Sequence, residues 1–127
     1  MSKSKLVKKL DQIFSKYIRY YYADTNGFVS CYTCGTTKPV KEMQCGHFQS
    51  RRHYATRWHT NNCRPQCVKC NMFMQGNIWI YGNKLKAEIG EDKFDELIQL
   101  SNTTVKRSQD DYKELIAYYK KELNNLM

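Results

Sequence analysis

The sequence contains no apolar run long enough to cross a membrane as a helix, so we expect no membrane partner. The opening residues Met1–Lys5 also lack the apolar core of a secretory signal peptide. Internal repeats and low-complexity tracts are absent as well. In a chain of 127 residues, these absences predict a single intracellular domain that works in the cytoplasm.

Acidic residues are scarce in the first part of the chain. Residues 1–75 hold 13 lysines and arginines against three aspartates and glutamates, whereas residues 76–127 hold eight against nine. The net charge of +9 therefore lies in the first part. A general gain in solubility would not explain this asymmetry, and a basic surface favours a polyanionic partner. We expect that partner to be DNA or another nucleic acid.

Four of the six cysteines form two C-x-x-C pairs, which are Cys31 with Cys34 and Cys67 with Cys70. Two such pairs at this separation are typical of a tetrahedral zinc site. Because four thiolates leave no position for water, this Zn²⁺ would hold the fold and perform no chemistry.

Other zinc ligand sets remain open, since they could include Cys45, Cys63 or His47. Cys45 and Cys63 have no C-x-x-C partner, and we expect them to be small buried apolar groups.

Several short motifs accompany the cysteine pairs, and we quote them as they stand: Gly46-His47-Phe48, Ser50-Arg51, Asn62, Gln66-Cys67, Cys70-Asn71 and Gly76-Asn77. Together with the cysteines they resemble the phage recombination proteins called NinG or Rap. Tyr81, Leu85, Gly90, Tyr119 and Leu126 are also similar, so the resemblance covers most of the chain. The C-x-x-C frame is common among zinc proteins, whereas the Gly-His and Cys-Asn placements are more specific.

The resemblance implies an α+β fold with a zinc-stapled ββα-metal core of the HNH or His-Me finger type. We expect one domain over residues 1–127, with an N-terminal helix in 1–26, the finger in 27–76 and a C-terminal helical region in 77–127. The resemblance also implies a phage-encoded protein that acts inside a bacterial host.

Local patterns give a matching outline of the elements. Apolar residues at three- and four-residue steps predict a helix over residues 4–24, with a stripe that runs from Leu6 to Tyr21. Residues 28–30 and 40–48 are expected to be extended, and residues 49–60 give no assignment.

A helix from about Val68 is predicted to break at Gly76-Asn77 and to resume until Gly90. Two more helices are predicted from Asp92 and from Ser108, the latter with a capping box to Asp111. The apolar stripe of the last helix could pack on the first helix or on a second copy of the chain. A two-fold homodimer would suit symmetric cutting of a four-way junction.

The resemblance places His47 as the general base that takes a proton from the water attacking a phosphodiester. The alternatives are a core hydrogen bond or zinc ligation. By similarity to endonuclease VII-like junction resolvases, Asn71 would hold a catalytic Mg²⁺, or Mn²⁺ in its place. Asn62 would brace the loop that orients the histidine. The alternatives are a helix N-cap for Asn71 and a turn for Asn62.

The sequence departs from the wider HNH class at Gly46, where many members carry an acidic metal ligand. Members of the NinG family share this glycine. The second ligand of the divalent ion is therefore unassigned, with Glu42, His53, His59 and a substrate phosphate as candidates.

Basic residues near this core are candidate DNA contacts, because guanidinium groups grip phosphates with two hydrogen bonds. They are Arg51, Arg52, Arg57, Arg64 and Lys69. The expected function is Mg²⁺-dependent cutting of branched recombination DNA such as Holliday junctions. The alternatives are a recombination mediator that binds DNA without cutting it, and an HNH nuclease that acts on linear duplex.

Overall fold

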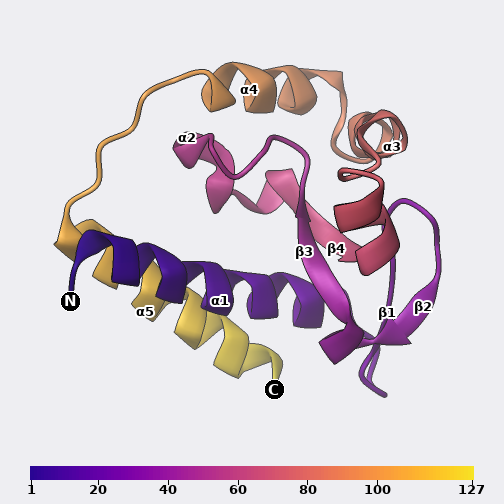
Figure 1. The fold of residues 1–127 in the computed structure, drawn as a ribbon, viewed down its shortest axis with the longest axis horizontal. Helices are drawn as coiled ribbons and strands as arrows, with labels where there is room; N and C mark the ends of the chain where they lie inside the picture. Colours follow the sequence, from indigo (N-terminus) through magenta and orange to yellow (C-terminus); the bar gives the residue numbers. More distant parts are fainter.

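Two long helices, α1 (Lys3–Tyr21) and α5 (Gln109–Leu126), lie against each other along one side of the computed structural model, which describes all 127 residues (Figure 1). α1 buries Leu6, Leu10, Phe14 and Ile18, which recur every four residues on one face. The rings of Phe14 and Tyr119 meet edge to face with centroids 4.8 Å apart. The apolar stripe of α5 thus packs on the first helix of the same chain.

The first helix ends earlier than predicted, whereas the last one begins where expected. α1 ends at Tyr21 and not at residue 24, and Tyr21 at the end of the predicted apolar stripe is exposed. The Asp24 carboxylate then accepts from the backbone amides of Asn26 and Phe28, which turns the chain. At the start of α5, Ser108 and Asp111 form the predicted capping box. No helix in the structure combines the length and the apolarity needed to span a bilayer.

Two small antiparallel hairpins lie beside this helix pair (Figure 1). β1 (Phe28–Ser30) pairs with β2 (Thr37–Pro39), and a single 3₁₀ turn, η1 (Val40–Glu42), leads into β3 (Met43–His47). β3 pairs with β4 (Cys63–Cys67), so that His47 lies opposite Cys63 and Gly46 lies opposite Arg64. The expected extended segment over residues 40–48 is therefore a strand only from residue 43.

The alternation of side chains along β3 and β4 gives the second hairpin two different faces. Cys45, His47 and Cys63 share the face that packs on α1, where Cys45 and Cys63 join the core formed by α1 and α5. Gly46, Arg64 and Gln66 lie on the opposite face. The loop between the strands contains α2 (Tyr54–Arg57) and a 3₁₀ turn, η2 (Thr60–Asn62), in the region that the sequence left unassigned.

After β4 the chain forms a π-helical turn, η3 (Lys69–Phe73), where the sequence predicted a longer helix. Positive φ angles at Gln75, Gly76 and Asn77 end this turn, and α3 (Ile78–Ile89) follows in a new direction. The break at Gly76-Asn77 is thus confirmed. Gly90, at φ 91°, separates α3 from α4 (Glu91–Ser101), as a C-terminal cap requires.

Candidate metal centre and active-site cavity

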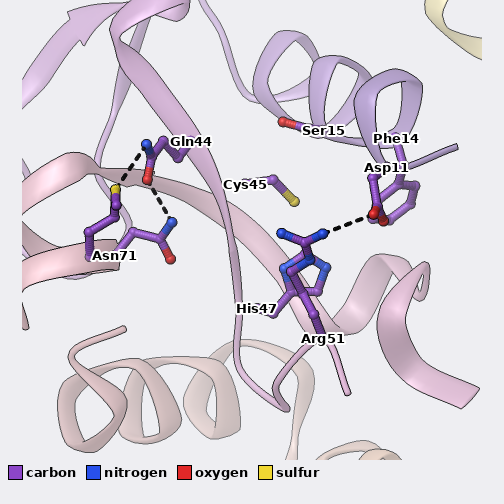
Figure 2. A pocket seen from close by; sticks show the side chains of 9 residues that line it. Asp11, Phe14, Ser15, Gln44, Cys45, His47, Arg51 and Asn71 are labelled. Carbon is purple, nitrogen blue, oxygen red and sulfur yellow. Dashed lines mark hydrogen bonds and ion pairs between the residues drawn. The ribbon is translucent and has the colours of Figure 1, made fainter. Parts of the chain in front are cut away.

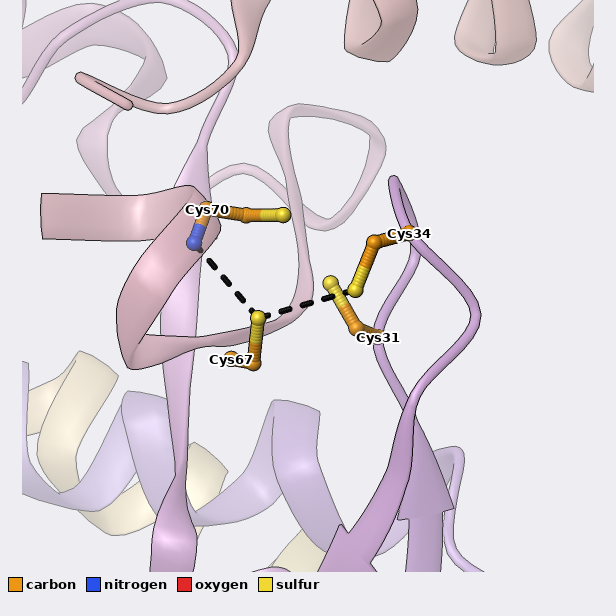
Figure 3. A group of neighbouring side chains, drawn as sticks. All are labelled: Cys31, Cys34, Cys67 and Cys70. Atoms are coloured by element: carbon orange, nitrogen blue, oxygen red, sulfur yellow. Dashed lines mark hydrogen bonds between the residues drawn. The ribbon is translucent and has the colours of Figure 1, made fainter. Parts of the chain in front are cut away.

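The four cysteines of the two C-x-x-C pairs converge on one point between the hairpins (Figure 3). Cys31 and Cys34 come from the turn after β1, whereas Cys67 ends β4 and Cys70 lies in the π turn. All four sulfur atoms lie within 4.8 Å of one another, and the sulfurs of Cys34 and Cys67 are 3.7 Å apart. Two ligands of a tetrahedral zinc with Zn–S bonds of 2.3 Å are separated by about 3.8 Å. The cluster can therefore hold one zinc ion.

The surroundings favour the thiolate at Cys31 and Cys34, whereas burial raises the pKa of Cys67 to about 12. Burial raises the pKa of Cys31, but hydrogen bonds from the Thr33 side chain and from backbone amides outweigh it and lower the pKa to about 6. Asn77 donates its side-chain amide to the Cys70 sulfur at 3.8 Å. Three of the four cysteines are buried and Cys34 is exposed, so the site is closed on one side and can be reached from the other.

A cavity of about 340 Å³ lies on the α1 face of the β3–β4 hairpin (Figure 2). His47 and Asn71 both line it, on opposite sides of β3 in Figure 2, together with residues that the sequence did not single out. The full lining is Asp11, Phe14, Ser15, Gln44, Cys45, His47, Arg51, Asn71 and Met72.

The His47 ring is held by one hydrogen bond, from Nε2 to the carbonyl of Arg57 at 2.8 Å. A carbonyl only accepts, so Nε2 carries the hydrogen and Nδ1 keeps a free lone pair. Burial lowers the pKa of His47 below its ordinary 6.5, and the nearby Arg51 charge lowers it further. The imidazole is therefore neutral at pH 7 and able to accept a proton.

Asn62 is fully buried behind this histidine. Its side chain accepts from the amide of Gln49 at 2.7 Å and donates to the carbonyls of Gln49 and Thr56 at 2.9 and 3.1 Å. These three bonds tie the two ends of the β3–β4 loop together. Because the same loop supplies the Arg57 carbonyl to His47, Asn62 has the geometry of a brace and lies out of reach of a substrate.

Asn71 reaches the cavity from the π turn and donates its side-chain amide to Gln44 at 2.7 Å (Figure 2). This bond fixes the orientation of the amide and leaves the Asn71 carbonyl oxygen without a protein partner. Asn71 is not the N-cap residue of a helix, since it lies inside the π turn that begins at Lys69.

Asp11 of α1 is the carboxylate that the sequence analysis missed. It accepts from Arg57 at 3.0 Å, from Trp58 at 2.9 Å and from Arg51 at 3.0 Å. Burial raises the pKa of Asp11, but the two guanidinium groups outweigh it and hold the pKa below its usual 3.8. Asp11 is the single acidic residue in the otherwise basic α1, and that isolation was the one signal in the sequence.

The other candidates for a second divalent ligand do not line the cavity. His53 hydrogen-bonds the carbonyl of Ser101, and His59 accepts from the amide of Asn61 at the start of η2. Glu42 lies in the 3₁₀ turn before β3 and is likewise outside the lining. The oxygen-bearing side chains that line the cavity with His47 are Asp11, Ser15, Gln44 and Asn71.

The five basic candidates divide into two groups. Arg57 and Arg64 are 9% and 2% exposed. Arg57 is paired with Asp11, and Arg64 with Glu88 of α3 at 3.0 Å. These two arginines hold elements together and do not face solvent. Arg51, Arg52 and Lys69 are exposed, and Arg51 also lines the cavity.

Cys45 and Cys63 do not join the four-cysteine cluster. They form a separate group with His47, in which the three ligand atoms lie within 4.8 Å of one another. Cys63 is fully buried as expected, whereas Cys45 is half-buried and lines the cavity. The fold and site thus define an α+β protein with a four-cysteine cluster that could hold a zinc ion, and with a separate cavity that contains a histidine.

Comparison with known proteins agrees with that description. The family model described as Bacteriophage Lambda NinG protein matches residues 1–127, and the chain belongs to this family. Protein ninG of Escherichia phage lambda is 26% identical over 121 residues, which cover 94% of this chain and 56% of the phage protein. Protein ninG of Escherichia phage 933W is also 26% identical, with 57% of its length covered. The chain thus spans little more than half the length of these curated relatives. No solved structure matches it.

Proposed function

We propose that the protein is a Mg²⁺-dependent endonuclease that hydrolyses DNA phosphodiesters, with branched recombination intermediates as its substrate. The observation that carries the proposal is the orientation of His47. Its Nε2 donates to the Arg57 carbonyl, and its ring lines the cavity with no protein hydrogen bond to Nδ1. A neutral imidazole held in one tautomer is suited to general-base catalysis.

The fold family supplies a second argument, although a weaker one. β3, β4 and the π turn occur in the order strand, strand, helix, which is the order of a ββα-metal finger. In this proposal His47 stands at the end of the first strand and Asn71 on the helical turn. The preference for branched DNA, and for Holliday junctions in particular, comes from the family resemblance alone.

The cavity can contribute few ligands to a catalytic divalent ion. The Asn71 carbonyl oxygen is free, whereas Gln44 is bonded to Asn71, and the Asp11 carboxylate is engaged by two arginines. Mg²⁺ commonly keeps several waters and binds through few protein oxygens plus substrate phosphates. The small number of free oxygen ligands in this cavity is compatible with such a site. When bound, such an ion would stabilise the charge that develops on the phosphate and on the leaving oxygen.

The chain's own residues account for the remaining steps. His47 would accept the proton of the attacking water at Nδ1, while the Arg57 carbonyl keeps the ring in place. Arg51 is 61% exposed in its ion pair with Asp11, and an exposed pair of this kind is weak. Arg51 is therefore free to turn to a substrate phosphate, with Arg52 and Lys69 extending the basic surface.

The test uses zinc-loaded protein with a labelled four-way junction and a matched linear duplex, each with Mg²⁺ or with EDTA. We expect Mg²⁺-dependent cutting of the junction. The His47→Ala variant should be slower by about 10²-fold or more, because it lacks the base. His53→Ala is the matched control, since His53 lies outside the cavity, and it should cut at close to the wild-type rate.

A DNA-binding recombination mediator that does not cut is the second candidate, and the scarcity of free carboxylates in the cavity favours it. Binding of both substrates without cleavage across several divalent ions, unchanged in His47→Ala, would support the mediator. Equal cutting of junction and linear duplex would instead identify a nuclease without preference for branched DNA.

A further inference from the structure

A second cluster of side chains that could bind a metal lies at the wall of the cavity, apart from the four-cysteine cluster. Cys45 and His47 come from alternate positions of β3, and Cys63 lies directly opposite His47 on β4. Residues at these positions project from the same face of a hairpin, so the fold brings their ligand atoms within 4.8 Å of one another. The two clusters share no residue.

We propose that Cys45, His47 and Cys63 form a second site, which binds a thiophilic divalent ion such as Zn²⁺ and blocks His47 when occupied. The blocking of His47 rests on the proposed nuclease function, whereas the metal site itself does not.

The chemistry of the three ligands selects the class of ion. Two thiolates and one imidazole are soft to borderline donors, which suit Zn²⁺ and its analogues Co²⁺ and Cd²⁺ and disfavour Mg²⁺. Nε2 of His47 donates to the Arg57 carbonyl, so in this tautomer Nδ1 carries the free lone pair, and we take Nδ1 as the ligand atom. A histidine ligand whose other nitrogen donates to a backbone carbonyl is the usual arrangement at zinc.

The position of the cluster gives an ion both access and an open coordination site. Cys45 and His47 line the cavity, and in Figure 2 the Cys45 sulfur points toward the side where His47 and Arg51 lie. Cys63 is fully buried behind them. Three protein ligands with a cavity on the fourth side leave one position for water or substrate.

Occupation of this site has a direct consequence for His47. The nitrogen that would accept a proton from water would instead be bonded to the ion, so the base would be lost. Excess Zn²⁺ would then inhibit cutting through residues that play no part in the four-cysteine centre.

Metal counting tests the site without reference to activity. Reduced protein is loaded with Co²⁺ or Zn²⁺, and unbound metal is removed. Native mass spectrometry then gives the number of ions bound per chain. We expect two ions per wild-type chain and one per Cys45→Ser chain. The cobalt–thiolate absorption of the variant should fall by roughly a third, since two of the six cobalt–sulfur bonds are lost.

Two further variants complete the count. Asn71 lines the same cavity but contributes neither a thiol nor an imidazole, so the Asn71→Ala variant should keep two ions. Cys63→Ala should bind one ion, and Cys45→Ser carries the test if Cys63→Ala fails to fold. A single ion in the wild type, an unchanged count of two in Cys45→Ser, or a Cys45–Cys63 disulfide in place of the second ion would each overturn the proposal.

Cutting assays then test the blocking of His47, with each protein compared with its own rate before zinc is added. Wild-type cutting should fall on addition of Zn²⁺, and Cys45→Ser should need at least about tenfold more Zn²⁺ for the same fractional loss. Equal sensitivity of the two proteins would overturn the blocking. A protein that binds two ions but never cuts would instead remove the proposed nuclease function and leave the metal site in place.

Discussion

Gly46 leaves no space for a side chain, because Gln66 lies over its Cα atom. A Cβ atom at Gly46 would stand 1.9 Å from Oε1 and 2.6 Å from Cδ of Gln66. Gln66 cannot swing aside, since it is fully buried and donates to Thr33 at 3.1 Å and to the Gly76 carbonyl at 2.8 Å. The acidic residue that many HNH nucleases carry before the histidine therefore has no room in this chain.

The first prediction follows from this contact. Gly46→Ala should lower the free energy of unfolding by about 1–3 kcal/mol, the usual cost of overpacking a well-filled core. The double variant Gly46→Ala/Gln66→Ala should lose less than the sum of the two single variants, because the clash is absent. Urea unfolding of the four proteins measures the coupling, and strict additivity would contradict the contact.

The second prediction concerns the pH dependence of cutting. Burial lowers the pKa of His47 below 6.5, so the ring stays neutral at pH 7 and gains a proton only as the pH falls through that lowered value. We expect kcat/KM for junction cutting to be flat above about pH 6.5 and to fall on the acid side with an apparent pKa below 6.5. The residual cutting of His47→Ala should lack this acid limb. An acid limb that persists in the variant would assign the titration to another group.

At the scale of elements, the sequence predicted both α1 and α5 but could not predict that they pack on each other. The spacing of apolar residues predicted both helices. The residue types at Gly90 and at Ser108 with Asp111 predicted the cap and the capping box, since each of these features depends on neighbours in sequence. Whether α5 packs on α1 or on a second chain depends on distant residues, and the structure gives α1 as its partner.

The third prediction tests that packing with two adjacent tyrosines. Tyr119 is buried against Phe14 and Tyr17, and its hydroxyl donates to the Trp58 carbonyl, whereas Tyr118 is 56% exposed. Tyr119→Ala should destabilise the chain by about 3 kcal/mol or more. Tyr118→Ala should cost less than about 1 kcal/mol. Thermal unfolding compares them, and similar losses would mean that α5 is not packed through this stripe.

The loop between β3 and β4 was beyond sequence reasoning for a physical reason. Its order comes from polar contacts with distant residues, such as Arg57 with Asp11 and His53 with the Ser101 carbonyl, and no periodicity records such pairs. A run of arginines looks the same in the sequence whether it faces DNA or a buried carboxylate. The cysteine pairs, by contrast, could be assigned because the ligand spacing of a zinc site is itself local.

The fourth prediction concerns Asn62, which braces this loop. Asn62→Ala removes three hydrogen bonds and leaves the half-buried amide and carbonyl of Gln49 without their side-chain partner, at a cost of about 1–3 kcal/mol. Hydrogen exchange should quicken over residues 48–62, and cutting should fall because the Arg57 carbonyl no longer holds His47. Unchanged exchange in this loop would show that Asn62 does not brace it.

At the scale of the whole molecule, the four-cysteine centre joins parts of the chain that have little else in common. The apolar cluster around it contains Val29, Cys31, Val40, Met43, Cys67 and Cys70, and three of these belong to the four-cysteine cluster that could hold zinc. β1 and β2 are three residues each and form a two-stranded hairpin, which is marginal on its own in water. Without the ion, this part of the fold has only a small apolar core.

The fifth prediction is therefore that removal of zinc unfolds the finger before it unfolds the helix pair. A strong chelator can compete for the ion through the exposed Cys34, and the folding free energy supplied by zinc binding would be lost. Hydrogen exchange should rise first over residues 28–47 and 63–77, while α1 and α5 keep their separate core of aromatic and aliphatic side chains. Because burial of β3 against α1 links the two parts, the melting temperature of the whole chain should also fall. A melting curve that does not change on chelation would show that the four cysteines hold no structural ion.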